Sequence, residues 1–145
     1  MVILDSNILI YAHIEGSAQH PKVKAWLSRS LSDGSEAIGI PWPVATAFLR
    51  ISTNRRIFEE PFDTKFARSC LDDLFGHHLV RAVGPTPDHW EHYSRIITEM
   101  NLAGDILMDA HIAAIAVEHK ATVATTDKDF RRFSDYVKII DPLAM

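Results

Sequence analysis

Short apolar runs alternate with longer segments of helical periodicity along the chain, and this alternation restricts the fold more than any other feature. Polar, glycine-containing or proline-containing stretches separate the runs from the helical segments. Strands that alternate with helices form a parallel sheet. The sequence therefore predicts an α/β fold, as one domain over residues 1–145, with a sheet of about five parallel strands flanked by helices on both faces. We expect strands over residues 1–4, 36–40, 79–83, 121–125 and 136–140, and helices over residues 7–12, 21–32, 44–52, 64–75, 86–100, 104–119 and 127–133.

Size, charge and cysteine content narrow the class of protein. The chain has 145 residues, which suits one domain with a sizeable core, and its net charge of -4 argues against a general binder of polyanions. Its single cysteine, Cys70, excludes an internal disulfide and a multi-cysteine zinc site. The sequence shows no signal peptide and no membrane-length apolar run, so we expect a cytoplasmic protein without membrane contact.

Acidic residues directly follow two of the expected strands. Asp5 ends the first apolar run, and Asp127 follows the run over residues 122–125, with Asp129 two positions further on. In an open α/β sheet, ligands bind at the carboxyl edge of the strands, so these carboxylates are candidates for chemistry. Each of them alone could instead be a helix cap, but caps need not converge on one edge of a sheet.

Two further carboxylates share one face of an expected helix. Asp105 and Asp109 are four residues apart, in the first turns of a helix whose remainder is apolar and contains no Lys or Arg nearby. Two carboxylates about 4 Å apart repel by about 4 kcal/mol at an effective dielectric constant of about 20, and a divalent cation removes this cost. Oxygen ligands without a histidine cluster favour Mg²⁺ or Mn²⁺. The alternative is that Asp105 and Asp109 only complement the helix dipole.

Three motifs taken together resemble a known family. They are Val-Ile-Leu-Asp-Ser-Asn ending at Asn7, Asp-Ala-His-Ile-Ala-Ala-Ile-Ala beginning at Asp109, and Thr-Val-Ala-Thr-Thr-Asp-Lys-Asp-Phe, which contains Thr126 and Asp127. Their order, with Phe-Leu-Arg at residues 48–50 and a closing Asp-Pro-Leu, resembles that of PIN-domain ribonucleases, specifically the VapC-type toxins of bacterial toxin–antitoxin pairs. The resemblance spans nearly the whole chain.

The resemblance implies a Mg²⁺-dependent endoribonuclease, the toxin of a type II pair, which is usually a homodimer and is held inactive by a small antitoxin protein. Asp5, Asp109 and Asp127 match the family's metal-binding aspartates, and Asn7 and Thr126 match polar residues that steady the site. In the mechanism that this implies, water activated by Mg²⁺ or Mn²⁺ attacks the scissile phosphate of RNA.

One position departs from the family's pattern. A glutamate commonly precedes the Phe-Leu-Arg stretch, and this chain has Ala47 there. We expect Asp105, one helical turn from Asp109, to take up part of that role as a further catalytic carboxylate that orients the nucleophile. The alternative is a catalytically weakened PIN scaffold that binds RNA or a protein partner. A receiver-like signalling module also places acids at this edge, but it needs a phosphorylatable aspartate on its middle strand and a late lysine, and neither is evident.

Candidate contacts for RNA and for a partner follow the third expected helix. Arg50, near its end, is a candidate for binding RNA phosphates, although a solvated basic helix end is an equal alternative. Ile57, Phe58 and Phe62 lie in a proline-containing loop and are candidates for an apolar groove that takes a partner peptide.

The eight histidines raise the question of a zinc site. His89 and His92 lie on one expected helix turn, and His77 is adjacent to His78. Without a third close ligand we do not expect zinc, and we interpret the histidines as surface or capping residues.

Overall fold

The computed structural model describes all 145 residues and contains five strands, six α-helices and one 3-10 helix. Strands and helices alternate as the sequence predicts, and the observed bounds agree with the expected ones to within a few residues. The strands are β1 (Val2–Leu4), β2 (Ile38–Pro41), β3 (Val80–Val83), β4 (Thr122–Ala124) and β5 (Ile139–Ile140). The helices are α1 (Ser6–His13), α2 (His20–Asp33), α3 (Trp42–Ser52), α4 (Thr64–Phe75), α5 (His89–Glu99), α6 (Ile106–Glu118) and the 3-10 helix η1 (Lys128–Phe133).

The five strands form one sheet in the order β3-β2-β1-β4-β5, and every neighbouring pair is parallel. The predicted α/β fold with a five-stranded parallel sheet is confirmed. The first strand of the chain is the central one, so it pairs with β2 on one side and with β4 on the other. Because Leu4 pairs with Ala124, the next residues along the two strands, Asp5 and Thr125, leave the sheet side by side.

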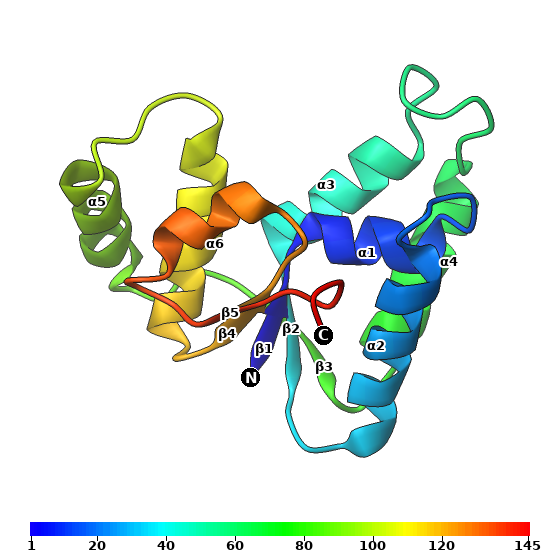
Figure 1. Ribbon diagram of the computed structural model, residues 1–145, viewed down its shortest axis with the longest axis horizontal. Coiled ribbons are helices and arrows are strands. Elements are labelled where there is room, and N and C mark those ends of the chain that lie inside the picture. The colour runs from blue at the N-terminus through cyan, green and yellow to red at the C-terminus, as the bar shows by residue number, and fades with distance from the viewer.

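Helices cover both faces of the sheet (Figure 1). Helices α1, α2, α3 and α4 pack together on one side, and α5, α6 and η1 lie on the other. Helix α6 is apolar on almost every side, and residues 112–116 within it are all buried, as expected for a helix inside a protein. None of the helices is long and apolar enough to cross a membrane.

The core contains 33 buried apolar residues drawn from both layers. Phe48 of α3 and Phe130 and Phe133 of η1 are its largest fully buried side chains, and the free Cys70 is also buried. Within the sheet, Gly39 lets its neighbours approach closely, because an added Cβ would lie 3.2 Å from both Ile3 Cγ1 and Val83 Cγ1. The core thereby fixes the strands whose carboxyl ends carry the acidic residues.

Candidate active site

Asp5 occupies the junction between the central strand and the first helix. Its side chain is 5% exposed, and its Oδ1 accepts a hydrogen bond from the backbone N–H of Ser6 at 2.7 Å, which caps α1. An acid that follows an apolar strand and precedes Ser-Asn produces this geometry, because the carboxylate satisfies a free N–H group at the helix start. Asp5 therefore caps α1 and also lies at the carboxyl edge of the sheet.

A hydrogen-bond network joins Asp5 to the other end of the chain. The Thr125 hydroxyl donates to Asp5 Oδ2 at 2.8 Å, and the Asn7 amide donates to Asp5 Oδ2 and to Thr125 Oγ1, both at 3.0 Å. The backbone N–H of Thr126 donates to Asn7 Oδ1 at 2.9 Å, and that of Asp127 donates to Thr125 Oγ1 at 3.1 Å. These bonds fix the Asp5 carboxylate beside the segment that leads into η1.

Burial raises the pKa of Asp5 above its usual value, and the negative charge of Asp127 adds to this rise. The hydrogen bonds from Thr125, Ser6 and Asn7 act in the opposite direction, because each stabilises the ionised carboxylate. The network therefore offsets only part of the cost of a buried negative charge.

Asp109 lies in the first turn of α6 and is half-buried. Burial and, next, the negative charges of Asp5 and Asp127 raise the pKa of Asp109 to about 6, while Arg132 partly opposes them. The structure thus brings Asp5, Asp109 and Asp127 into electrostatic contact from three separate elements, as the sequence predicts. A half-buried carboxyl group with a pKa far above 3.8 marks a site where like charges gather without enough compensation.

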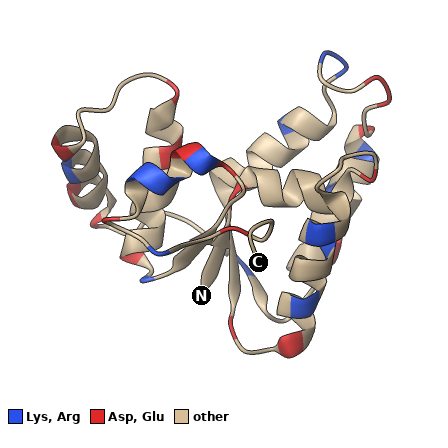
Figure 2. Ribbon diagram, in the orientation of Figure 1, with Lys and Arg blue, Asp and Glu red and all other residues tan.

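Asp127 and Asp129 complete the acidic edge. Asp127 is exposed and caps η1, where its Oδ1 accepts a hydrogen bond from the backbone N–H of Asp129 at 2.9 Å. Helix η1 packs against α6, and its basic residues bring positive charge close to this edge (Figure 2). Arg132 is the basic residue that lowers the pKa of Asp109.

Four other residues named from the sequence have different environments. Asp105 is exposed at the start of α6, makes no capping hydrogen bond, and is not among the main charges that shift the pKa of Asp109. Arg50 is exposed in the last turn of α3, and Ala47 is half-buried on the same helix. Thr126 contributes its backbone N–H to the network through Asn7.

The whole chain matches one family of known proteins. The PIN domain family model matches residues 2–136. Ribonuclease VapC31 of Mycobacterium tuberculosis is 36% identical over 145 residues, covering 99% of this chain and 100% of that protein. The VapC ribonuclease Mb2897 of Mycobacterium bovis is 33% identical over 133 residues, covering 92% and 90%. The chain belongs to the PIN-domain family, among the VapC ribonucleases.

A solved structure agrees with this assignment of the fold. The crystal structure of VapBC2 from Rickettsia felis bound to a promoter DNA fragment matches with a TM-score of 0.71 and 18% identity, over 97% of this chain and 98% of that one. The family recognised from three short motifs is confirmed, and the chain is a VapC-type nuclease.

The acidic edge of this VapC-type nuclease fits a hard divalent cation in its chemistry. Its donors are carboxylate oxygens that repel one another, and a cation would relieve the repulsion that raises the pKa of Asp109. No group of three His, Cys, Asp or Glu side chains is close enough to hold a metal ion as it stands. The carboxylates therefore lie near one another but do not form a preorganised metal site.

Thr125 is the residue that sequence reasoning missed. It is 1% exposed, and its hydroxyl contacts Asp5, Asn7 and the backbone of Asp127. The signal that points to Thr125 is its position in the register, one residue beyond the Leu4–Ala124 pair, and that register is not visible in the sequence.

The interpretation of the histidines as surface or capping residues is wrong for His89. The His89 side chain is 14% exposed and bridges Glu118 of α6 and His111 of the same helix. Sequence spacing hides this cluster, because its members come from two helices that pack side by side only in the fold.

Proposed function

We propose that this VapC-type nuclease is a Mg²⁺-dependent endoribonuclease, with Mn²⁺ as an alternative ion, and that Asp5, Asp109 and Asp127 hold the metal. The observation that supports this proposal is the pKa of Asp109, which burial and the charges of Asp5 and Asp127 raise to about 6. A buried cluster of acids without a matching cation is costly for a folded protein, and such clusters concentrate at functional sites.

The protein's own residues prepare the site in three ways. The hydroxyl of Thr125 and the amide of Asn7 hold Asp5 in one orientation. Asp109, with a pKa of about 6, is mostly ionised at neutral pH, so it can accept a cation or a proton there. A bound divalent cation would supply Lewis acidity toward water and phosphate oxygens.

Asn7 and Thr126 steady the site in this proposal. Arg50, exposed in the last turn of α3, contacts an RNA phosphate through its positive charge. Asp105 serves as a further catalytic carboxylate from the start of α6. The weakened-scaffold alternative rests on Ala47, and the experiment below separates it from an active enzyme.

The test is RNA cleavage by Asp109→Asn, with Asp5→Asn and Asp127→Asn beside it. Each substitution removes one charge that a cation requires, so we expect cleavage of structured RNA in Mg²⁺ to fall by at least about 100-fold. Calorimetric titration with Mn²⁺ should show weaker binding in each variant. Asp135→Asn, at an exposed acid near β5, is the matched control and should behave like the parent.

Two results would contradict the proposal. Asp109→Asn cleaving RNA at the parental rate would show that the site lies elsewhere. A parent protein that binds no divalent cation and cleaves no RNA would favour the silent scaffold.

We also propose an antitoxin partner, because a solved structure of similar fold is that of a toxin–antitoxin complex from Klebsiella pneumoniae. Phe58 and Phe62 line a hollow of about 470 Å³ between the α1–α2 loop and α4, whose other apolar members are Ile14 and Phe66. Ile57, the third residue named from the sequence, is 52% exposed and does not line it. The hollow is bordered by Glu15, Glu59 and Glu60, so it suits a peptide with apolar anchors and basic flanks.

Binding of the antitoxin and formation of a homodimer are tested separately. Phe62→Arg should reduce co-purification with the small protein encoded beside this one, whereas Ile57→Arg should not. The proposed homodimer is tested by light scattering of the isolated chain, and a monomer at high concentration would contradict it.

A further inference from the structure

Polar contacts join helices α5 and α6 at three places along their length. At the carboxyl end of α6, Glu118 accepts hydrogen bonds from Thr86 N and Thr86 Oγ1, at 2.9 and 2.6 Å, and its Oε2 lies 2.5 Å from His89 Nδ1. In the middle, His89 Nε2 lies 2.8 Å from His111 Nδ1. Near the amino end, the Tyr93 hydroxyl donates to the Leu107 carbonyl at 2.9 Å.

This network leaves one ring nitrogen without a partner. The Glu118 side chain is 1% exposed; burial alone would raise its pKa, but the hydrogen bonds from His89 and Thr86 outweigh burial and lower it. The ionised Glu118 accepts from His89 Nδ1–H, and one hydrogen bond joins His89 Nε2 to His111 Nδ1. The second ring nitrogen of His111, Nε2, has no hydrogen-bond partner within the protein.

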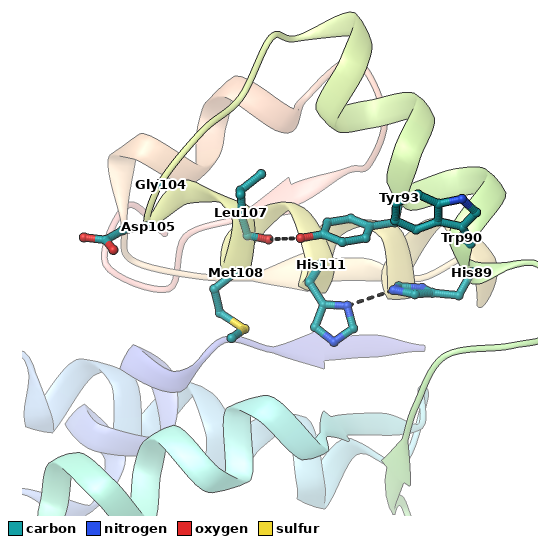
Figure 3. A pocket seen from close by; sticks show the side chains of 8 residues that line it. All are labelled: His89, Trp90, Tyr93, Gly104, Asp105, Leu107, Met108 and His111. Atoms are coloured by element: carbon teal, nitrogen blue, oxygen red, sulfur yellow. Dashed lines mark hydrogen bonds between the residues drawn. The ribbon is translucent and has the colours of Figure 1, made fainter.

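A pocket of about 570 Å³ opens between the two helices above this network (Figure 3). Tyr93 and Leu107 lie at its centre, Met108 and His111 on one flank and Trp90 at the far side, while the Asp105 carboxylate points away. Trp90 is 69% exposed and Met108 is 55% exposed, so large apolar groups face solvent here. The Trp90 and Tyr93 rings meet edge to face, with centroids 6.3 Å apart.

The pocket reaches the amino-terminal end of α6, because Asp105 and Met108 belong to its lining. The first turn of the same helix carries Asp109. Within the pocket itself, stacking surfaces and neutral hydrogen-bonding atoms outnumber charges, since Asp105 is its only charged residue and turns outward.

We propose that this pocket binds one unstacked nucleobase of a single-stranded RNA segment. The proposal deepens the proposed ribonuclease function and rests on it. The Trp90 ring offers the exposed aromatic face on which a base stacks, and Met108 provides a second apolar surface. His111 Nε2, which has no partner within the protein, is available for a hydrogen bond to a polar edge of a base such as adenine. A base in a duplex cannot reach this surface, so the pocket selects unpaired nucleotides.

The test measures how much affinity one base contributes. The probe is a fluorescent 2′-O-methyl oligoribonucleotide with a single adenine among abasic positions, and the matched probe is abasic throughout; both are titrated by anisotropy in metal-free buffer. The parent should bind the adenine probe about 5- to 100-fold more tightly than the abasic probe. Trp90→Ala should remove this difference without changing abasic binding, and Trp90→Phe, which keeps an aromatic face, should retain most of it.

Three outcomes would overturn the proposal. Equal binding of the two probes by the parent would show that no base is held. A base-dependent difference that survives Trp90→Ala would place the base elsewhere. A dimer that Trp90→Ala converts to a monomer in light scattering would make this surface an interface between two copies.

Failure of the pocket and failure of the nuclease assignment are distinguishable. If cleavage requires Asp109 but the adenine adds no affinity, only the pocket proposal fails. If adenine binding requires Trp90 but Asp109→Asn leaves cleavage unchanged, the pocket stands and the assigned metal site is wrong.

Discussion

Helix α6 carries two clusters of titratable groups that are built in opposite ways. On one side Asp109 faces Asp5 and Asp127, and burial together with these negative charges raises its pKa to about 6. On the other side Glu118 has partners for both carboxylate oxygens, and its pKa is lowered. The buried acid with partners holds two helices together, whereas the acids that lack a counter-charge are the ones left for a ligand.

The comparison teaches how to separate structural from functional acids. Burial penalises ionisation at both places, so burial alone does not distinguish them. The difference lies in the neighbours: hydrogen-bond donors around Glu118, and carboxylates around Asp109. A carboxylate whose neighbours disfavour its charge is maintained for a reason other than stability. Four predictions test this contrast.

The largest effect is expected at Glu118. Glu118→Ala leaves His89 and the Thr86 N–H group without their acceptor, so the free energy of unfolding should fall by about 2 to 4 kcal/mol. Urea unfolding at pH 7 measures the loss, with the exposed Glu91→Ala on α5 as control. A loss no larger than that of the control would show that the network contributes no net stability. It would contradict the distinction between Glu118 as a structural acid and Asp109 as a functional one.

A smaller loss of stability is expected when a hydrogen-bond donor to Asp5 is removed. Thr125→Val keeps the shape of the side chain but removes the hydroxyl that bonds Asp5 and Asn7. We expect about 1 to 2 kcal/mol less stability and about tenfold slower RNA cleavage, because Asp5 loses its fixed orientation. Thr122→Val, at the other end of β4, is the matched comparison and should preserve both properties. Equal effects at the two threonines would contradict this account.

The third prediction concerns pH in metal-free protein. The pKa of Asp109 rises from 3.8 to about 6 on folding, so between these values the folded protein binds more protons than the unfolded chain. This group's contribution to the free energy of unfolding therefore falls as pH rises from about 4 to about 6. Asp109→Asn should remove that slope and be more stable than the parent at pH 7 by about 1 kcal/mol, after allowing for solvent screening.

The measurement is the difference between parent and Asp109→Asn in urea unfolding across this pH range. The difference is required because burial lowers the pKa of His13 and of His111, and those groups change stability in the opposite sense over the same range. A constant difference at every pH would show that Asp109 has an ordinary environment.

The smallest effect tests whether Asp105 compensates for Ala47. If α3 presents position 47 to the acidic edge, Ala47→Glu adds an oxygen ligand, and Mn²⁺ affinity should rise about 3- to 5-fold. Asp105→Asn should then reduce cleavage more in the parent than in the Ala47→Glu protein, with a coupling of about 0.5 to 1 kcal/mol. Unchanged Mn²⁺ affinity, with Asp105→Asn harmless in both backgrounds, would mean that Asp105 is a surface charge.

The sequence predicts most of the fold because its local signals agree with one another. The strand that ends at Asp5, the glycine after α2 and the proline near the start of α3 are each readable without tertiary information. The convergence of Asp5 and Asp127 is also predictable, since parallel strands share one carboxyl edge. Asp109 lies on a helix, and its place beside them is predicted from the family resemblance.

The parts that the sequence does not reveal depend on register and on helix packing. Thr125 becomes important only because β4 pairs with β1 in a register that places it beside Asp5. The role of His89 depends on α5 packing against α6, which brings together residues 22 and 29 positions apart. No local pattern encodes either arrangement.

The pairing of β1 with β4 also determines at what stage of synthesis the acidic edge can form. Asp5 leaves the ribosome at the start of synthesis, but the hydroxyl that orients it belongs to Thr125, 120 residues later. A nascent chain that ends before β4 has an open side on its central strand and lacks Thr125 and Asp127. Such long-range pairing folds slowly and only after the chain is nearly complete. The acidic edge is therefore incomplete in a nascent chain until β4 and Asp127 have been synthesised.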